Sequence, residues 1–123
     1  MAHFVKIENN IVTQTIVIDN NDCNGGNFPE SETFGQSFIE NVLKKSGVWL
    51  QTSYNANFRN FYAGYGFLYL EDKDIFIPQC QYQSWVIAKN ENNKWNWIAP
   101  KPTPDNENQW EWDENIIDWV IIN

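Results

Sequence analysis

The chain is poor in basic residues, with 8 Lys and Arg against 16 Asp and Glu and a formal net charge of −8. A nucleic-acid binder needs a basic patch that displaces counterions from phosphates, so we expect no nucleic-acid partner. The same sign of charge opposes binding to acidic membrane surfaces. No segment approaches the ~20 consecutive apolar residues that span a bilayer, so we expect no membrane association.

Cysteine and histidine are also scarce. Cys23 and Cys80 are the two cysteines, without CxxC spacing, and His3 is the single histidine. One disulfide is possible, but two unpaired thiols in a reducing cytosol is the favoured interpretation. The chain enters an alternating pattern directly after Met1, without the apolar core of a signal peptide.

Catalytic and metal-binding patterns are absent as well. His3 has no Ser or Cys neighbour at motif spacing, and no GxSxG elbow occurs. Asp19 and Asp22 could ligate calcium, but the motif of a helix–loop–helix calcium site is missing, and a solvated turn is favoured. A pair of catalytic carboxylates, as in a glycosidase, is the kind of active site that is hardest to exclude. The sequence does not give the distance between two carboxylates in the folded chain. We therefore expect a protein that is not an enzyme and has no metal or cofactor.

Aromatic residues and asparagine are abundant. The chain has 7 Trp, 5 Tyr and 8 Phe, and Asn-Asn pairs occur at 9–10, 20–21 and 92–93. Asn tolerates left-handed backbone conformations, whereas aromatics favour strands, so this composition predicts many tight turns between strands. A length of 123 residues predicts a single domain, 1–123.

The first 18 residues predict an antiparallel hairpin. Asn9-Asn10 suits a two-residue turn that needs positive φ at both positions. This turn predicts one mainly apolar face and one mainly polar face, as in a half-buried hairpin. The predicted pairs on the apolar face are Ile7–Val12 and Val5–Gln14, and those on the polar face are Lys6–Thr13 and Glu8–Ile11.

Residues 31–46 predict the helix. Pro29 stiffens its entry, Ser31 is the predicted cap, and Lys44-Lys45 in the last turn oppose the helix dipole before Gly47 ends the helix. An apolar stripe at helical spacing predicts that the helix packs across a sheet. The stripe comprises Phe34, Phe38, Ile39, Val42 and Leu43.

Residues 48–122 predict successive β-hairpins. A strand at 48–53 is followed by hairpins at 66–77, 85–97 and 110–122, each with a polar turn. Pro100, Pro102 and Pro104 lie between the last two hairpins, as a rigid spacer. The predicted fold class is α+β, an antiparallel hairpin-rich sheet with one amphipathic helix packed on it.

Tryptophans alternate along the last two hairpins, so several must share a face. A shared face could be an open platform that stacks on sugar rings or a protein interface, where Trp and Tyr are enriched. It could also be the core of small hairpins that have little other area to bury. The candidate interface or glycan-binding residues are Trp85, Trp95, Trp97, Trp110, Trp112 and Trp119.

Several motifs resemble those of small virion-associated structural proteins of marine tailed phages such as cyanophages. The central motifs are Trp49-Leu50-Gln51-Thr52-Ser53-Tyr54-Asn55 and Asn57-Phe58-Arg59-Asn60-Phe61-Tyr62-Ala63-Gly64-Tyr65-Gly66-Phe67. Further matches are Ile75-Phe76-Ile77-Pro78, Ser84-Trp85, Trp97-Ile98-Ala99-Pro100, Trp112-Asp113-Glu114 and Trp119-Val120.

The resemblance implies a virion structural protein, either a capsid decoration or a tail accessory. It implies contacts with major capsid or tail proteins, a homo-oligomer on the particle, and a location in the virion and, during assembly, in the host cytoplasm. The family carries no catalytic residues to transfer. The alternative function is a carbohydrate-binding or host-surface-binding module that uses exposed Trp residues.

The central motif also has a physical interpretation. Gly64 and Gly66 permit a tight backbone turn, Arg59 can tie this turn through its planar guanidinium, and Tyr62 and Tyr65 pack around it. The sequence allows two roles for the motif, a determinant of the fold or a docking surface, and does not decide between them. The candidate structural residues are Trp49, Tyr54, Arg59, Tyr62, Gly64 and Gly66.

Overall fold

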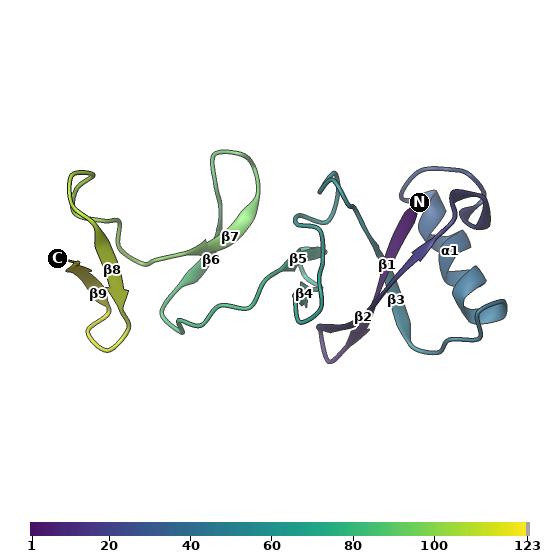
Figure 1. Cartoon of the computed structure of the whole chain (residues 1–123), viewed down its shortest axis with the longest axis horizontal. Helices are drawn as coiled ribbons and strands as arrows, with labels where there is room; N and C mark the ends of the chain where they lie inside the picture. Colours follow the sequence, from purple (N-terminus) through teal and green to yellow (C-terminus); the bar gives the residue numbers. More distant parts are fainter. Residues whose placement is uncertain (123) are drawn as a thin grey trace. The chain divides into compact units, whose positions relative to one another are not determined.

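The computed structural model describes residues 1–122 and has an α+β fold, which confirms the predicted class (Figure 1). One α-helix, a curled five-stranded antiparallel sheet and two separate two-stranded hairpins make up the regular structure of these residues. The contacts divide the chain into two compact units, Met1–Gln79 and Cys80–Asn123, a boundary that the single-domain prediction did not include. The two units are described in turn.

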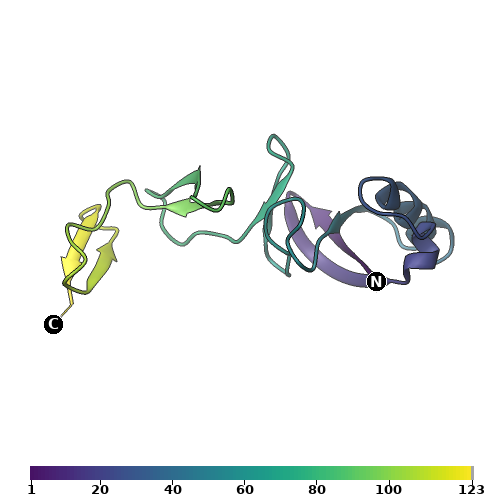
Figure 2. The same ribbon diagram turned by 90° about the horizontal axis from the view of Figure 1, so that it is seen from above.

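The first unit contains the five-stranded sheet, in the order β3-β1-β2-β4-β5. Its strands are β1 (Ala2–Glu8), β2 (Ile11–Ile18), β3 (Val48–Thr52), β4 (Leu68–Leu70) and β5 (Ile75–Ile77). All four pairings in this sheet are antiparallel, and β3 and β5 are its edge strands. Figure 2 shows the long β1–β2 hairpin next to the helix.

The N-terminal hairpin forms as predicted near its turn and differs beyond it. Asn9 and Asn10 have φ of 53° and 64°, and the pairs Ile7–Val12 and Glu8–Ile11 are confirmed. A bulge between Lys6 and Ile7 then shifts the register by one residue. The predicted pairs Val5–Gln14 and Lys6–Thr13 are therefore wrong, because Val5 lies opposite Thr15 and Lys6 opposite Gln14.

Each face of the hairpin carries buried residues, so the prediction of one mainly apolar and one mainly polar face is wrong, although Gln14, Thr15 and Val17 of β2 are exposed. Side chains alternate between the two faces of a strand, and Phe4 and Val5 enter different hydrophobic clusters. The cluster that includes helix residues contains Ala2, Phe4, Ile18, Cys23, Ile39 and Trp49. The other contains Val5, Val12, Ala63 and Phe76, with Ile7, Leu50, Phe67 and Tyr69 packed against it.

Helix α1 (Glu30–Asn41) starts near the predicted position and ends five residues before the predicted end at 46. Pro29 occupies the cap position, and the Ser31 hydroxyl donates to Gln51 Oε1 at 2.7 Å instead of capping the helix. Lys44 has a φ of 59° and reverses the chain. The two lysines therefore follow the helix instead of lying in its last turn.

The buried face of α1 differs from the predicted stripe. Ser31, Gly35 and Ile39 are its buried residues, spaced four apart, with Phe38 partly buried beside them. Phe34, Val42 and Leu43 are exposed. Small residues at positions 31 and 35 allow α1 to approach the sheet closely, a role that a pattern of large apolar residues does not reveal.

The second unit contains the two hairpins predicted at 85–97 and 110–122. They are formed by β6 (Val86–Lys89) with β7 (Trp95–Ile98), and by β8 (Trp110–Asp113) with β9 (Asp118–Ile121). Asn93 supplies a left-handed residue in the first turn, with a φ of 63°. Trp112 lies directly opposite Trp119 in the second hairpin.

Candidate functional site

The Arg59 side chain contacts several separate segments of the first unit. Its guanidinium binds both carboxylate oxygens of Glu32 on α1, and its Nε donates to Asp74 Oδ1 at 2.9 Å. Arg59 Nη1 also donates to the Gln51 carbonyl at 3.0 Å, and the guanidinium lies 5.0 Å from the centre of the Phe28 ring. Burial lowers the Arg59 pKa, but the bond to Glu32 and the charges of Glu32 and Asp74 outweigh it and raise the pKa.

The segment at Arg59 and Asn60 connects the two edge strands of the curled sheet. On β3, the Gln51 carbonyl accepts from the Arg59 side chain. On β5, Phe76 N–H donates to the Arg59 carbonyl at 3.0 Å, and Asn60 Nδ2 donates to the Phe76 carbonyl at 3.0 Å. These bonds occupy backbone groups that exposed edge strands would offer to other chains.

Side chains of α1 cover further outward groups of β3. Gln36 Nε2 donates to the Trp49 carbonyl at 2.7 Å, and Gln51 N–H donates to Glu32 Oε2 at 2.8 Å. Trp49 itself is buried, and its indole N–H donates to the Ser46 carbonyl at 3.1 Å. Both edges are thus partly closed by the first unit itself, which disfavours assembly by strand addition at these positions.

The glycine-rich part of the motif does not have the arrangement that we predicted from the sequence. Gly66 has a φ of 86° and supplies the turn, whereas Gly64 does not have a positive φ. Arg59 binds α1, β3 and the β4–β5 turn instead of tying this turn. Tyr62 and Tyr65 are exposed and do not form a packed layer around it.

An aromatic cluster on the first unit joins His3 to two tyrosines of the motif. The His3 ring stacks on Tyr54 at 5.3 Å and meets the edge of Tyr62 at 5.4 Å between ring centres. The Tyr62 hydroxyl lies 3.2 Å from His3 Nδ1. Burial, followed by the nearby N-terminal charge, lowers the pKa of His3, which favours the neutral ring at pH 7. The spacing of these three residues in the sequence did not predict that they lie together.

Three of the predicted tryptophans form the centre of the second unit. The Trp112 ring meets Trp119 at 5.2 Å and Trp85 at 5.9 Å, both edge to face, and Trp85 lies 5.2 Å from Tyr82. Trp112 is the buried one of the three. Edge-to-face aromatic pairs are favourable packing arrangements, so this cluster acts as a small core. Within residues 1–122, Trp85 Nε1 is a buried donor without a hydrogen-bond partner.

The other three predicted tryptophans are half-buried around this core. Trp95 contacts Lys89, whose Nζ lies 5.4 Å from the ring centre, and Trp110 Nε1 donates to Asp105 Oδ1 at 3.3 Å. Trp97 lies opposite Ile87 on β6. None of the six candidate tryptophans is exposed, whereas a sugar platform needs an open aromatic face.

Glu114 connects the two hairpins of the second unit. Its carboxylate accepts from Ser84 N–H at 3.0 Å, from the Ser84 hydroxyl at 2.6 Å and from Trp112 Nε1 at 2.8 Å. The side-chain bond from Ser84, followed by that from Trp112, lowers the pKa of Glu114. This carboxylate therefore positions Trp112 and the turn that follows it.

We expect Glu114→Ala to destabilise the second unit and to remove part of its acid sensitivity. A lowered pKa means that the ionised carboxylate stabilises the fold above its ordinary pKa of 4.5, and that this contribution disappears as pH falls through the lowered pKa. Tryptophan fluorescence during denaturation at neutral and acid pH measures both effects. Glu111→Ala, an exposed acid on β8, is the matched control, and equal midpoints for the two variants would contradict the assignment.

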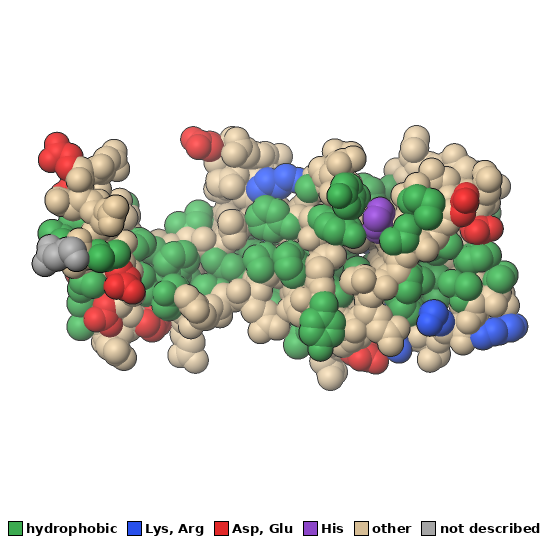
Figure 3. All heavy atoms as spheres, viewed as in Figure 1, with side chains coloured by type: hydrophobic (Ala, Val, Ile, Leu, Met, Phe, Trp, Pro, Cys, Tyr) green, Lys and Arg blue, Asp and Glu red, His purple; other side chains and the backbone are tan. Residues whose placement is uncertain are grey.

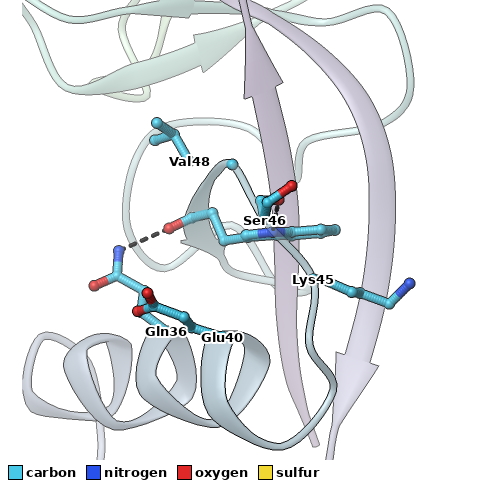
Figure 4. Close-up of a pocket in the computed structure, with 7 residues that line it drawn as sticks. Gln36, Glu40, Lys45, Ser46 and Val48 are labelled. Atoms are coloured by element: carbon cyan, nitrogen blue, oxygen red, sulfur yellow. Dashed lines mark hydrogen bonds between the residues drawn. The ribbon is translucent and has the colours of Figure 1, made fainter.

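An apolar surface with two lysines lies at the end of α1. Val42 is 61% exposed, and Phe34 and Leu43 are also exposed. Val48, which is 59% exposed, lies with Ile7 and Leu50 on the face of β3 away from α1. A hollow of about 290 Å³ lies between α1 and the start of β3, lined by Gln36, Glu40, Lys45, Ser46, Gly47, Val48 and Trp49 (Figure 4). We call Val42, Leu43, Lys44 and Lys45 the helix-end surface, and Figure 3 shows basic side chains beside hydrophobic ones near the end of α1.

A second exposed apolar feature is the turn between β8 and β9. Ile116 and Ile117 are adjacent and 58% and 47% exposed. Ile117 has a φ of 53°, a left-handed conformation that is unusual for a β-branched residue. We call Ile116 and Ile117, with the acids Asp113, Glu114 and Asp118 around them, the isoleucine turn.

The remaining sequence candidates have structural roles or no convergent partners. Cys23 is buried and Cys80 half-buried, and both are free thiols, as favoured from the sequence. Asp19 Oδ1 accepts from Asn21 N–H at 2.9 Å at the start of a short 3₁₀ helix (Asn20–Cys23). Within residues 1–122, no three His, Cys, Asp or Glu side chains are arranged to hold a metal ion. The described part also contains no helix with the length and apolar character needed to cross a membrane.

Comparisons with known proteins do not identify a relative. No protein-family model, no curated protein and no solved structure matches this chain.

Proposed function

We propose that this chain is a non-enzymatic structural protein of a phage particle, a capsid decoration or a tail accessory, that acts through protein–protein contacts. The observation that carries the proposal is the pair of exposed apolar features with charged rims, the helix-end surface and the isoleucine turn. Exposed apolar patches rimmed by polar residues are typical of protein interaction sites. The motif resemblance supplies the setting, a virion with major capsid or tail proteins as partners.

The roles of the polar side chains also support a structural protein. Arg59, Glu32 and Asp74 hold the first unit together, and Glu114 holds the hairpins of the second. These charged side chains are bound by partners within the fold. The tryptophans that would carry the alternative, carbohydrate binding, are half-buried or buried, so we rank that function second.

Mass spectrometry of purified virions tests this proposal. We expect the chain in particles, at hundreds of copies for a capsid decoration and a few to tens for a tail accessory. Its absence from particles, combined with abundance in infected cells, would overturn the virion assignment and leave a protein that acts inside the host.

A further inference from the structure

The curled sheet of the first unit leaves part of its interior open. Val5, Val12 and Phe76 are fully buried in this interior, and beside them, next to the Asn9–Asn10 turn, lies a pocket of about 420 Å³. Small-molecule sites commonly have volumes of about 300–1,000 Å³. We call this cavity the sheet pocket, and its lining residues are Ile7, Asn9, Asn10, Val48, Leu50, Tyr69 and Glu71.

Three strands supply the apolar wall of the sheet pocket. Ile7 on β1 lies directly opposite Val48 on β3, and directly opposite residues share a face of a sheet. Leu50, two residues beyond Val48, is on the same face. Tyr69 on β4 lies opposite Phe76, and both Tyr69 and Leu50 pack against the buried cluster. The apolar wall therefore continues the core of the sheet and is not a separate surface patch.

Hydrogen bonds fix this wall within the first unit. The Tyr69 hydroxyl donates to Asp74 Oδ1 at 2.6 Å, and Arg59 Nε donates to the same oxygen at 2.9 Å. Arg59 Nη1 also donates to the Gln51 carbonyl on β3. The Tyr69 N–H donates to the Asn10 carbonyl at 2.8 Å, which ties the turn between β1 and β2 to β4. A pocket with fixed walls needs little ordering when a ligand binds.

The polar rim of the sheet pocket carries a negative charge. Glu71 is exposed, and within residues 1–122 its carboxylate has no hydrogen bond or ion pair. The lysines nearest to the rim in sequence, Lys6 and Lys73, bind Glu8 and Asp72. The lining residues include neither Lys nor Arg. A ligand with a cationic head would therefore meet an unpaired carboxylate, whereas an anionic head would be repelled.

We propose that the sheet pocket binds a small amphipathic cation, a molecule with an apolar body and a protonated amine. The apolar body lies between Ile7, Leu50 and Tyr69, and the amine lies beside Glu71. The volume is that of a small-molecule site, whereas a stable protein interface needs a far larger complementary surface. The inference adds a ligand site to the chain and does not rest on its proposed place in a virion.

Three probes with the same apolar body and different heads test the proposal. They are phenethylamine, phenethyl alcohol and hydrocinnamate, which carry an amine, a hydroxyl and a carboxylate. Each probe is titrated into the full chain at pH 7, where the amine is protonated and the carboxylate is ionised. NMR spectra of the methyl groups and of the tyrosine rings measure the affinity and locate the bound probe.

We expect phenethylamine to bind with a dissociation constant of about 1 mM, an ordinary affinity for a ligand of its size. The shifted signals are expected at Ile7, Val48, Leu50 and Tyr69. Phenethyl alcohol is expected to bind about threefold more weakly, because it lacks the ion pair with Glu71. Hydrocinnamate is expected to bind more weakly than the alcohol, and added salt is expected to reduce the difference between amine and alcohol.

Variants of the full chain test the two parts of the site separately. Glu71→Gln removes the charge of the rim, so amine and alcohol are expected to bind equally to it. Val48→Arg places a long cationic side chain at the opening and is expected to abolish binding of the amine. Glu111→Gln removes an exposed acid of the second unit and is the matched control, expected to bind like the wild-type chain. Circular dichroism and thermal unfolding check the folding of each variant.

The absence of saturable shifts at Ile7, Leu50 and Tyr69 with phenethylamine would overturn the proposal. Hydrocinnamate that binds as tightly as the amine would also overturn it, as would a preference for the amine that Glu71→Gln leaves unchanged. If Val48→Arg does not fold, the comparison of amine and alcohol on Glu71→Gln still decides, since Glu71 lies in an exposed turn. The composition of virions does not affect any of these results, so the proposed function is tested independently.

Discussion

Replacement of Arg59 by alanine is expected to lower the free energy of unfolding of the first unit by about 3 kcal/mol, in the range for breaking a buried ion pair. The Arg59 side chain is only 8% exposed, and its loss leaves the Glu32 carboxylate largely buried and without this cation. It also removes the bond to the Gln51 carbonyl on β3. Chemical denaturation followed by circular dichroism measures the change.

Two further variants separate the causes of this loss. Arg59→Lys keeps the charge but cannot bind Glu32 and Asp74 with a planar guanidinium, so we expect an intermediate loss. Lys45→Ala removes an exposed cation and is expected to change stability by less than about 0.5 kcal/mol. A denaturation midpoint for Arg59→Ala equal to that of Lys45→Ala would show that Arg59 does not hold the sheet edges together.

Replacement of Gly35 by alanine is expected to destabilise the first unit by about 1–2 kcal/mol. An added Cβ would lie 2.6 Å from Phe4 Cε1 and 3.1 Å from Cys23 Sγ, and Phe4 is fully buried. Overpacking of this kind costs about 1–3 kcal/mol, more than the ~1 kcal/mol gained from the higher helix propensity of alanine. Thermal unfolding measures the difference.

Gly26→Ala is the matched control, because no atom lies within 4 Å of its added Cβ and its φ is not positive. We expect it to be neutral or slightly stabilising, through reduced entropy of the unfolded chain. Phe4→Leu in the Gly35→Ala background is expected to recover part of the loss, since the smaller side chain relieves the contact. Stability of Gly35→Ala at or above the wild-type value would mean that α1 is less closely packed on the sheet.

The local structure of this chain was largely predictable from its sequence. Turn chemistry is encoded by neighbouring residues, so Asn9-Asn10 predicted the N-terminal turn, and the later hairpins followed from alternating strands around polar turns. The helix was predictable from apolar residues at helical spacing. It ends earlier than this pattern indicates, and Lys44 beyond its end adopts a positive φ.

Tertiary packing decided the faces and the partners. The bulge between Lys6 and Ile7 changed the register of β1 and β2, and segments far along the chain pack on part of each face of the hairpin. Gly35 is not part of the predicted apolar stripe, but its closeness to Phe4 makes it part of the buried face of α1. A register shift and a close approach depend on the summed packing of distant segments, which no local pattern contains.

The sequence by itself determined the turns and the hairpins, because these depend on residues within a few positions of one another. The fold class followed from the pattern of these elements along the chain. Only the tertiary structure decided that Arg59 meets Glu32 and Asp74, that Trp85 meets Trp112 and Trp119, and that Ile116 and Ile117 stay exposed. Arg59 and Glu32 are 27 residues apart in sequence. Such pairs form when strands and helix pack, so their identity is a property of the whole fold rather than of any segment.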